Sequence, residues 1–498
     1  MKYINFQKNR KAISPVAVVL IAAALFMTGC KKFLDVPPKD KVPEGKLFSN
    51  EEGFKEALIG VYLAMDKPTN GGKQGLYTND LSMGMLSTLA YDYDNAPLST
   101  AGLNGKFFSN VVYYFYTEPD VRAEIDGIWG GMYNNIANLN NLLSQIDGKK
   151  DIFTADNFNR VKGEAIALRA LFHFDLARMF GQPPLTGMSA KAIPYQTQFS
   201  VKSTPFSTLQ AALDSCITDL AAAKDLLAMT DTSAVLKAAN DPFKAYTQNH
   251  LNYWAVQGLL ARVYLYKGDL ENAEKHAKAL IGNGKFPLVS SNLAASGNIV
   301  RDRMYSQEHL FSVYSTNIGN IGSDLFQRTN GTPLRLLPAG KNAIYTTGTG
   351  SVNDWRYISW FDNNAAGVNV PSKYFQDANL PYELKGIVPV VRMPEMFYIA
   401  AECATTKGNI NSGTALLNKV RQARGLAALN ASGISSSDSL SKEIMREYQK
   451  EFISEGQTFF YYKRFNKDLR QVTSTTAVII PADVYIFPIP DREKEYNR

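Results

Sequence analysis

The stretch GEAIALRALFHFDLARMFG, residues 163–181, gives the clearest indication of fold class in the sequence. Within the segment 156–180, apolar side chains recur three or four residues apart, the spacing that gathers them on one face of an α-helix. These side chains are Ala165, Leu168, Phe172 and Leu176. Gly181, Pro183 and Pro184 follow directly, and this combination ends helices. The segment therefore predicts a long helix with one face in a core.

The same apolar spacing continues along much of the chain. Eight further segments carry it: 51–65, 121–146, 208–227, 249–267, 270–281, 393–406, 414–424 and 440–465. The run Tyr113-Tyr114-Phe115-Tyr116 instead suggests a short strand with alternating faces. We expect a mostly α fold.

A partial internal repeat punctuates the helical segments. Residues 266–270 (YKGDL) and 406–410 (TKGNI) each separate two helical patterns. Around the first copy, Ala261, Tyr264 and Ala273 occupy the small, aromatic and small positions of a tetratricopeptide-like unit. Each such hairpin needs neighbours to cover its apolar face, so the scattered units are expected to pack into one superhelical scaffold.

Two long segments between the helical blocks have a different composition. Residues 70–117 and 282–391 are rich in Gly, Asn, Ser and Tyr. Loops of this length are unusual inside a compact domain and tend to carry function. We expect loop-rich inserts that form the variable face of the protein.

The sequence contains no recognisable catalytic or metal-binding constellation. Only 4 histidines occur, and His173 lies among phenylalanines, where a packed role fits best. The motifs of serine hydrolases, P-loop proteins and zinc proteases are absent. We therefore expect no enzyme, no metal and no cofactor. Cys216 and Cys403 are expected to be buried free thiols, because two cysteines make no disulfide framework.

Aromatic residues in the inserts are the best candidates for ligand contacts. Trp355, Tyr357 and Trp360 lie in NDWRYISWF, and Tyr91, Asp92 and Tyr93 lie in the first insert. Flat rings suit the C–H faces of pyranose sugars, while neighbouring polar groups can bond the hydroxyls. These six residues are our predicted ligand-binding set. The alternative is that the rings anchor the inserts to the scaffold.

The N-terminus predicts a lipoprotein signal peptide. Residues 1–10 are basic, residues 15–27 carry no charge, and small residues precede Cys30. This pattern resembles a bacterial lipobox, so residues 1–29 would be removed and Cys30 acylated, anchoring the chain to a membrane. Residues 30–48 would then be a tether. Without the four bases before Cys30, the chain keeps 49 bases against 46 acids, and this balance favours no nucleic-acid surface.

Several segments together resemble the SusD/RagB-like family of outer-membrane lipoproteins of Bacteroidetes. In order, they are residues 33–35 (FLD), 128–138 (IWGGMYNNIAN), the 163–181 helix, the turn around Gly268, 391–396 (VRMPEM), 417–421 (LNKVR) and 487–493 (FPIPDRE). No single motif decides, but the shared order is specific. The resemblance covers nearly the whole chain, so we treat residues 30–498 as one SusD-like domain.

The resemblance implies a fold, a role and a partner. The fold would be a scaffold of four tetratricopeptide-like helical hairpins with a loop-rich insert face. The protein would sit on the outer membrane facing the cell exterior, although Lys31 and Lys32 stand where surface lipoproteins of these bacteria often carry acids. It would capture a glycan and act as the lid of a SusC-like TonB-dependent transporter, without cleaving bonds. Two alternatives remain: peptide cargo in the same role, or a lipid-anchored scaffold that assembles proteins.

The sequence also departs from the family pattern in one helix. Glu447, Glu451, Glu455 and Gly456 match, but Thr458 and Tyr461 replace the usual Arg and Asp. We expect a local salt bridge to be lost there. Asp354 and Arg356 match a recurring D-x-R element, which favours a structural role for Arg356.

Overall fold

The structure is a computed structural model. It describes residues 44–68, 75–94, 105–234, 239, 241–289, 301–327, 333–345, 353–430, 434–467 and 483–496. The predicted signal peptide, Cys30 and most of the tether lie outside these residues. The chain divides into an N-terminal unit, Met1–Ser49, which contains helix α2 (Glu44–Leu47), and a main body, Asn50–Arg498. The remaining description concerns the body.

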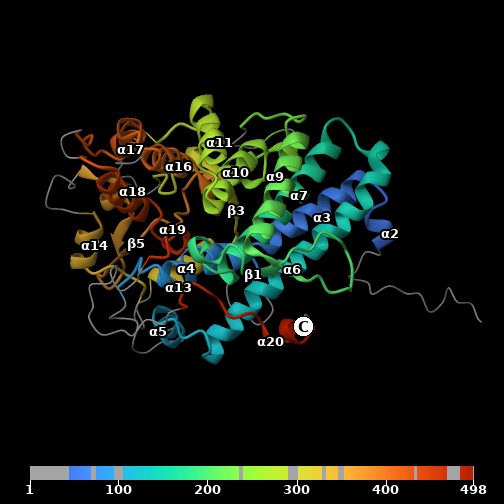
Figure 1. Cartoon of the computed structure of the whole chain (residues 1–498), viewed down its shortest axis with the longest axis horizontal. Coiled ribbons are helices and arrows are strands. Elements are labelled where there is room, and N and C mark those ends of the chain that lie inside the picture. The colour runs from blue at the N-terminus through green and yellow to red at the C-terminus, as the bar shows by residue number, and fades with distance from the viewer. Residues whose placement is uncertain are drawn as a thin grey trace, which may run out of the picture. The chain divides into compact units, whose positions relative to one another are not determined.

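The body is built mainly of helices, as predicted (Figure 1). The helices of the scaffold are α3 (Glu51–Ala64), α6 (Pro119–Ile146), α7 (Asn157–Phe180), α9 (Leu209–Leu227), α10 (Tyr253–Lys267), α11 (Leu270–Asn283), α16 (Met393–Thr406), α17 (Ile410–Ala423), α18 (Ser437–Glu451) and α19 (Gln457–Arg464). Among the described residues, eight of them pack as four pairs: α3 with α6, α7 with α9, α10 with α11, and α16 with α17. Helix α9 also packs on α10, and α11 on α16, so the pairs form one continuous scaffold.

Helix α7 is more central than its sequence indicates. Every residue from Gly163 to Phe180 is buried, so the helix is covered on all sides and not on one face alone. A Cβ on Gly163 would lie 2.7 Å from Leu227 Cγ of α9, so glycine lets the two helices approach closely. His173 is a packed residue, as predicted. It stacks on Tyr195 with the ring centroids 3.9 Å apart.

The two repeat turns have the same backbone form. Gly268 and Gly408 have φ angles of +89° and +80°, the left-handed region that glycine adopts without strain. After the first turn, the Asp269 side chain accepts a hydrogen bond from Asn272 N and caps α11. The predicted repeat therefore marks two equivalent helical turns.

The predicted helix 440–465 is wrong in one respect, because it is two helices. Helix α18 ends at Glu451 and α19 begins at Gln457. Ser454 and Gly456 between them have φ angles of 62° and 70°, which no continuous helix allows. A Cβ on Gly456 would collide with the carbonyl oxygen of Leu81, so contact with a distant segment fixes the break.

Three two-stranded antiparallel sheets accompany the helices in the described residues. Strand β1 (Lys191–Pro194) pairs with β2 (Phe206–Thr208), β3 (His309–Tyr314) with β6 (Ile387–Arg392), and β4 (Phe361–Asn363) with β5 (Asn369–Pro371). The predicted strand at residues 113–116 is wrong. Helix α5 (Gly105–Val112) ends there in turns, and Tyr114 has a φ of 59°, which interrupts extended backbone.

The first insert is partly core. Residues 76–90 are all buried, and they include a π-helical turn (Leu76–Asp80) and helix α4 (Met85–Leu89). A surface loop was expected there, and that expectation is wrong. The tyrosine and asparagine side chains that suggested a loop are enclosed by the scaffold. Tyr77, for instance, donates a hydrogen bond to Asp175 of α7.

Parts of the second insert gather beside the C-terminal helices. In Figure 1, α14 (Pro338–Tyr345) and β5 lie at the left, on the side of α18, α13 (Ile318–Phe326) lies nearer the middle, and α3, α7 and α9 lie toward the right. Helix α14 packs directly against α18. The insert is therefore attached to the C-terminal end of the scaffold.

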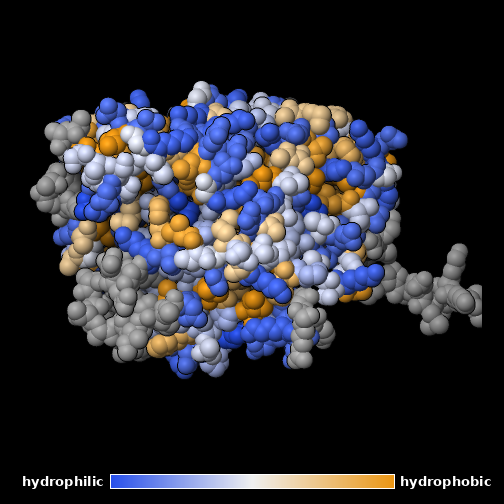
Figure 2. Space-filling view, viewed as in Figure 1, coloured by the Kyte–Doolittle hydropathy of each residue, from blue (hydrophilic) through white to orange (hydrophobic). Residues whose placement is uncertain are grey.

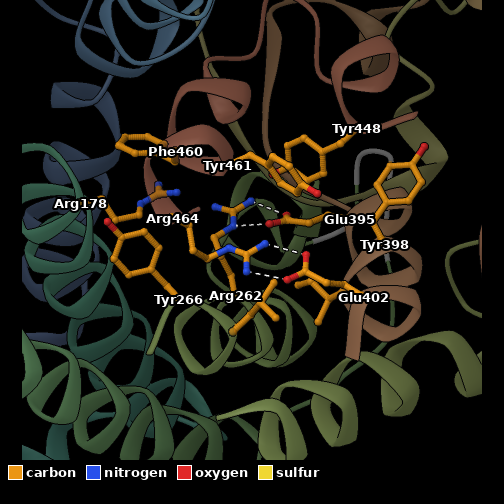
Figure 3. A pocket seen from close by; sticks show the side chains of 12 residues that line it. Arg178, Arg262, Tyr266, Glu395, Tyr398, Glu402, Tyr448, Phe460, Tyr461 and Arg464 are labelled. Atoms are coloured by element: carbon orange, nitrogen blue, oxygen red, sulfur yellow. Dashed lines mark hydrogen bonds and ion pairs between the residues drawn. The ribbon is translucent and has the colours of Figure 1, made fainter. Parts of the chain in front are cut away.

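Buried ion pairs join α16 to α10 and to α19 (Figure 3). Arg262 binds Glu395 through two bonds of 2.7 and 2.5 Å, and Arg464 binds Glu402 through two of 2.6 Å. Tyr461, in place of the usual Asp, stacks on Tyr448 at 4.5 Å. A cavity of about 30 Å³ remains between these side chains. Such a volume suits ordered water and not an organic ligand. Through its pair with Glu402, Arg464 keeps a salt bridge in α19 even though the usual Arg and Asp are replaced there.

No helix among the described residues is long and apolar enough to cross a membrane. On the face drawn in Figure 2, apolar residues form small groups between hydrophilic ones. Within the described chain Cys216 and Cys403 are buried free thiols, as predicted.

Candidate functional site

The NDWRYISWF segment begins with a fixed turn. Asp354 caps helix α15 (Trp355–Ser359) by accepting a hydrogen bond from Arg356 N at 3.0 Å. The same carboxylate binds the Arg356 guanidinium at 2.9 and 2.7 Å. Arg356 also binds Glu447 at 2.8 Å and Glu451 at 3.0 Å, and its side chain has no exposed surface. The predicted structural role of Arg356 is therefore confirmed.

Arg356 belongs to a larger buried ion network centred on Glu451. Arg424 binds Glu451 at 3.0 and 2.7 Å and Glu308 at 2.8 and 2.7 Å. Arg392 binds Glu451 at 2.8 Å. Burial alone raises the pKa of Glu451, but the arginines lower it well below its usual value. The network ties α15 to the turn that precedes β3, to β6 and to α18, so the insert has a rigid base.

Three of the six predicted ligand residues are packing residues. Trp360 has no exposed surface, donates from Nε1 to Arg303 O at 2.8 Å and lies 3.8 Å beneath Lys373 Nζ. The Asp92 carboxylate accepts a hydrogen bond from Ser454 N, and the Tyr93 hydroxyl donates to Met83 O. Asp92 and Tyr93 are also buried. Their burial contradicts a direct ligand contact and fits the alternative, in which the side chains anchor the inserts.

The other three residues, Trp355, Tyr357 and Tyr91, are half-buried at the surface. The Tyr357 hydroxyl donates to Asn342 Oδ1 at 3.1 Å. The Tyr91 hydroxyl donates to Val112 O at 3.3 Å. These three rings retain surface that a ligand can reach.

Helix α14 connects the two groups of predicted residues. At its start, Leu337 N donates to the carboxylate of Asp94, three residues after Tyr91. One turn later, Lys341 Nζ lies 3.9 Å from the centroid of the Tyr357 ring and 4.2 Å from that of Phe361. Burial lowers the pKa of Lys341 to about 8. A single lysine in a Gly- and Asn-rich segment carries no motif, so sequence reasoning missed it.

Beyond Lys341, polar side chains continue along strands β4 and β5. Lys341 Nζ donates to Asn369 Oδ1 at 3.3 Å, and Asn369 donates to Asn363 at 3.1 Å. Asn363 lines an open hollow of about 460 Å³ together with Arg301, Arg303, Asp362, Phe375, Gln376 and Asp377. In this hollow Asp362 accepts from Arg303 at 3.0 Å.

We call this run of residues the β4 strip, defined as Lys341, Asn342, Tyr357, Asp362, Asn363, Asn369, Arg301, Arg303 and Phe375. It combines aromatic rings with closely spaced hydrogen-bonding side chains, some positively charged, one negatively charged and some neutral. Such a surface can bond several hydroxyl groups of one extended ligand and stack on its apolar faces. Among the described residues, no group of His, Cys, Asp and Glu is placed to hold a metal ion.

Two family models match the chain in order. Residues 32–265 match a SusD-like model described as "Starch-binding associating with outer membrane", and residues 314–497 match the SusD family. Among curated proteins, SusD-like protein P38 of Formosa agariphila is 23% identical over 92% of both chains. SusD-like protein P2 of the same organism is 24% identical over 53% of this chain, and the match spans only 46% of that protein.

Solved structures share the fold. A SusD superfamily protein from Bacteroides fragilis superposes with a TM-score of 0.68 at 20% identity, covering 91% of this chain and 99% of that one. A SusD-like carbohydrate-binding protein from Bacteroides vulgatus gives 0.67 at 17% identity, covering 90% and 96%. A protein described as a laminarin-binding SusD-like protein gives 0.59 at 18% identity, covering 90% and 98%. With the ordered motifs, the paired helices and these matches, the chain belongs to the SusD/RagB-like family.

Proposed function

We propose that this protein is a surface lipoprotein that captures a glycan and delivers it to a SusC-like TonB-dependent transporter, acting as the transporter's lid. One observation carries the proposal. Both halves of the chain match SusD-type family models in order, one of them described as starch-binding and associated with the outer membrane. The role is binding and gating, with no bond cleavage.

Glycan capture at the β4 strip follows from its chemistry. Tyr357 offers a half-buried ring, and Asn342, Asn363 and Asn369 offer polar atoms beside it. Trp355 and Tyr91 extend the candidate surface. A structural neighbour is described as binding laminarin, a glycan, and this supports the same ligand class here.

Isothermal titration of the full-length protein against laminarin, starch and a panel of other polysaccharides tests glycan capture. We expect Tyr357→Ala to weaken binding of the recognised glycan about fivefold, because a stacked ring contributes of order 1 kcal/mol. Phe199→Ala is the matched control, since it removes an aromatic ring that is 55% exposed elsewhere. Unchanged affinity in Tyr357→Ala, Trp355→Ala and Tyr91→Ala would remove these residues from the site. Peptide binding with no response to any glycan would favour the alternative cargo.

The partner and the anchor have separate tests. A tagged protein isolated from detergent-treated outer membranes is expected to bring a TonB-dependent transporter with it. Recovery of no transporter would count against both uptake roles and favour a scaffold. Cys30→Ala is expected to release the protein from membranes, since it removes the site of acylation. Proteolysis of intact cells is expected to degrade the protein, and full protection would contradict exposure on the cell exterior.

A further inference from the structure

A second cavity, of about 200 Å³, shares no lining residue with the β4 strip. It lies between the turn 242–250, the end of β3 and the turn 381–387. Its lining residues are Pro242, Ala245, Tyr246, Asn249, His250, Tyr314, Tyr382, Glu383, Lys385 and Ile387. The three tyrosines are up to 136 positions apart in the sequence, and the fold brings them to one place.

Tyrosine rings form the wall of this cavity. The rings of Tyr246 and Tyr382 meet edge to face, with their centroids 6.0 Å apart. A hydrogen bond with Tyr382 raises the pKa of Tyr314, so the hydroxyls of these two residues meet as well. Tyr382 is 63% exposed. Tyr246 has a φ of 48°, a left-handed conformation that is unfavourable for a bulky side chain and is associated with functional sites.

Two polar side chains, Asn249 and His250, line the same cavity. Asn249 Oδ1 is buried and has no hydrogen-bond partner among the described residues. Buried polar atoms normally have a partner, so this oxygen points to a ligand donor.

The second polar side chain is that of His250. His250 Nδ1 lies 2.9 Å from Glu164 Oε2, whose carboxyl group is fully buried. Burial alone raises the pKa of Glu164, but His250 and the Tyr62 hydroxyl lower it overall. Nδ1 therefore donates a hydrogen bond to the carboxylate, which leaves Nε2 for a hydrogen bond with a ligand hydroxyl.

We propose that this cavity binds one uncharged pyranose residue of a glycan, as a site separate from the β4 strip. The C–H face of the sugar lies against Tyr246 and Tyr382, one hydroxyl donates to Asn249 Oδ1, and another forms a hydrogen bond with His250 Nε2. The rim carries one acid, Glu383, and one base, Lys385, so it provides no net charge for an ionic ligand. The volume is below the range of about 300–1,000 Å³ for larger ligands, which limits the site to a single ring. This inference rests on the proposed function as a glycan-binding protein.

The test uses the full-length protein and the polysaccharide that binds it in the panel above. Tyr382→Ala removes an exposed ring, and Asn249→Leu removes the side-chain acceptor at nearly the same size. We expect each to weaken binding about five- to tenfold in titration, while Phe199→Ala leaves the affinity unchanged. Thermal unfolding of each variant confirms that the protein is folded. Since neither variant touches the β4 strip, Tyr357→Ala combined with Tyr382→Ala is expected to weaken binding more than either substitution alone.

The outcomes separate the two proposals. If the glycan binds with unchanged affinity to both Tyr382→Ala and Asn249→Leu, the second site is overturned and the proposed function stands. If no polysaccharide in the panel binds the unsubstituted protein, the proposed function is overturned, and this site with it. A crystal structure of the complex with a sugar ring against Tyr382 would support the inference directly.

Discussion

The helical pairs and the α15–β4 segment are held by different interactions. Between α7 and α9 the contact depends on close apolar packing, with Gly163 against Leu227. Around α15 it depends on charge, with Arg356, Arg392 and Arg424 sharing the carboxylate of Glu451. The helical repeats are therefore held together by close packing of apolar side chains, whereas the insert is held by buried ion pairs. Substitutions should therefore follow different rules in the two regions.

The largest effect is expected in the ion network. Arg356→Met leaves Asp354, Glu447 and Glu451 short of a cation in a site with no exposure to water. Removing one partner of a buried ion pair costs about 3–5 kcal/mol. Urea denaturation should show this loss. The matched control is Arg446→Met, which breaks an exposed pair with Glu443 and should change stability by less than about 1 kcal/mol. Equal effects of the two substitutions would contradict the contrast between the regions.

A smaller effect is expected between the helices. Gly163→Val places atoms where Leu227 now packs, and overpacking of a core costs about 1–3 kcal/mol. Gly130→Val on α6 is the control, because no atom lies within 4 Å of a Cβ added there. Denaturation midpoints of both variants provide the measurement. If Gly163→Val proves as harmless as Gly130→Val, the close approach of α7 and α9 is not required.

The Asp92 side chain should produce a pH dependence. Burial raises the pKa of Asp92 from 3.8 to about 7. In this range the folded state holds a proton that the unfolded state has lost, so stability falls as the pH rises from about 4 to 7. Asp92→Asn cannot lose that proton and should gain stability relative to the unsubstituted protein between pH 4 and pH 8. Melting temperatures across this range test the prediction, and a constant difference would contradict it.

The smallest effect is expected at Lys341, at the outer edge of the charged region. Its ammonium group gains from the rings of Tyr357 and Phe361 but loses by burial. Because these contributions oppose each other, Lys341→Met should change stability by less than about 1 kcal/mol. If Lys341→Met lost as much stability as Arg356→Met, Lys341 would contribute to stability as strongly as the arginines of the ion network. Thermal unfolding at pH 7 gives the comparison.

The sequence predicted the helices better than the surfaces. The spacing of Leu168, Phe172 and Leu176 is local, and α7 follows from it. The break between α18 and α19 depends on Gly456 meeting Leu81, a contact between residues far apart in the chain. The spacing of apolar residues along the chain gives no information about that long-range contact, so it predicted one continuous helix.

The candidate site was predictable only in part, and for a physical reason. Residue type marked Trp355 and Trp360 equally, because both are tryptophans in the same polar segment. Only the fold distinguishes the half-buried Trp355 from the fully buried Trp360. The tyrosine cavity was missed altogether, since Tyr246, Tyr314 and Tyr382 come from three separate segments.

The shared carboxylate of Glu451 also limits how this sequence can evolve. Three arginines bind it, so loss of any one leaves the other charges without full compensation in a site closed to water. Replacement of any one of these residues by an uncharged side chain therefore costs too much stability to be retained. Substitutions at positions 356, 392, 424 and 451 should be accepted only together. These four positions should change slowly and in concert, while residues of the β4 strip remain free to diversify with the cargo.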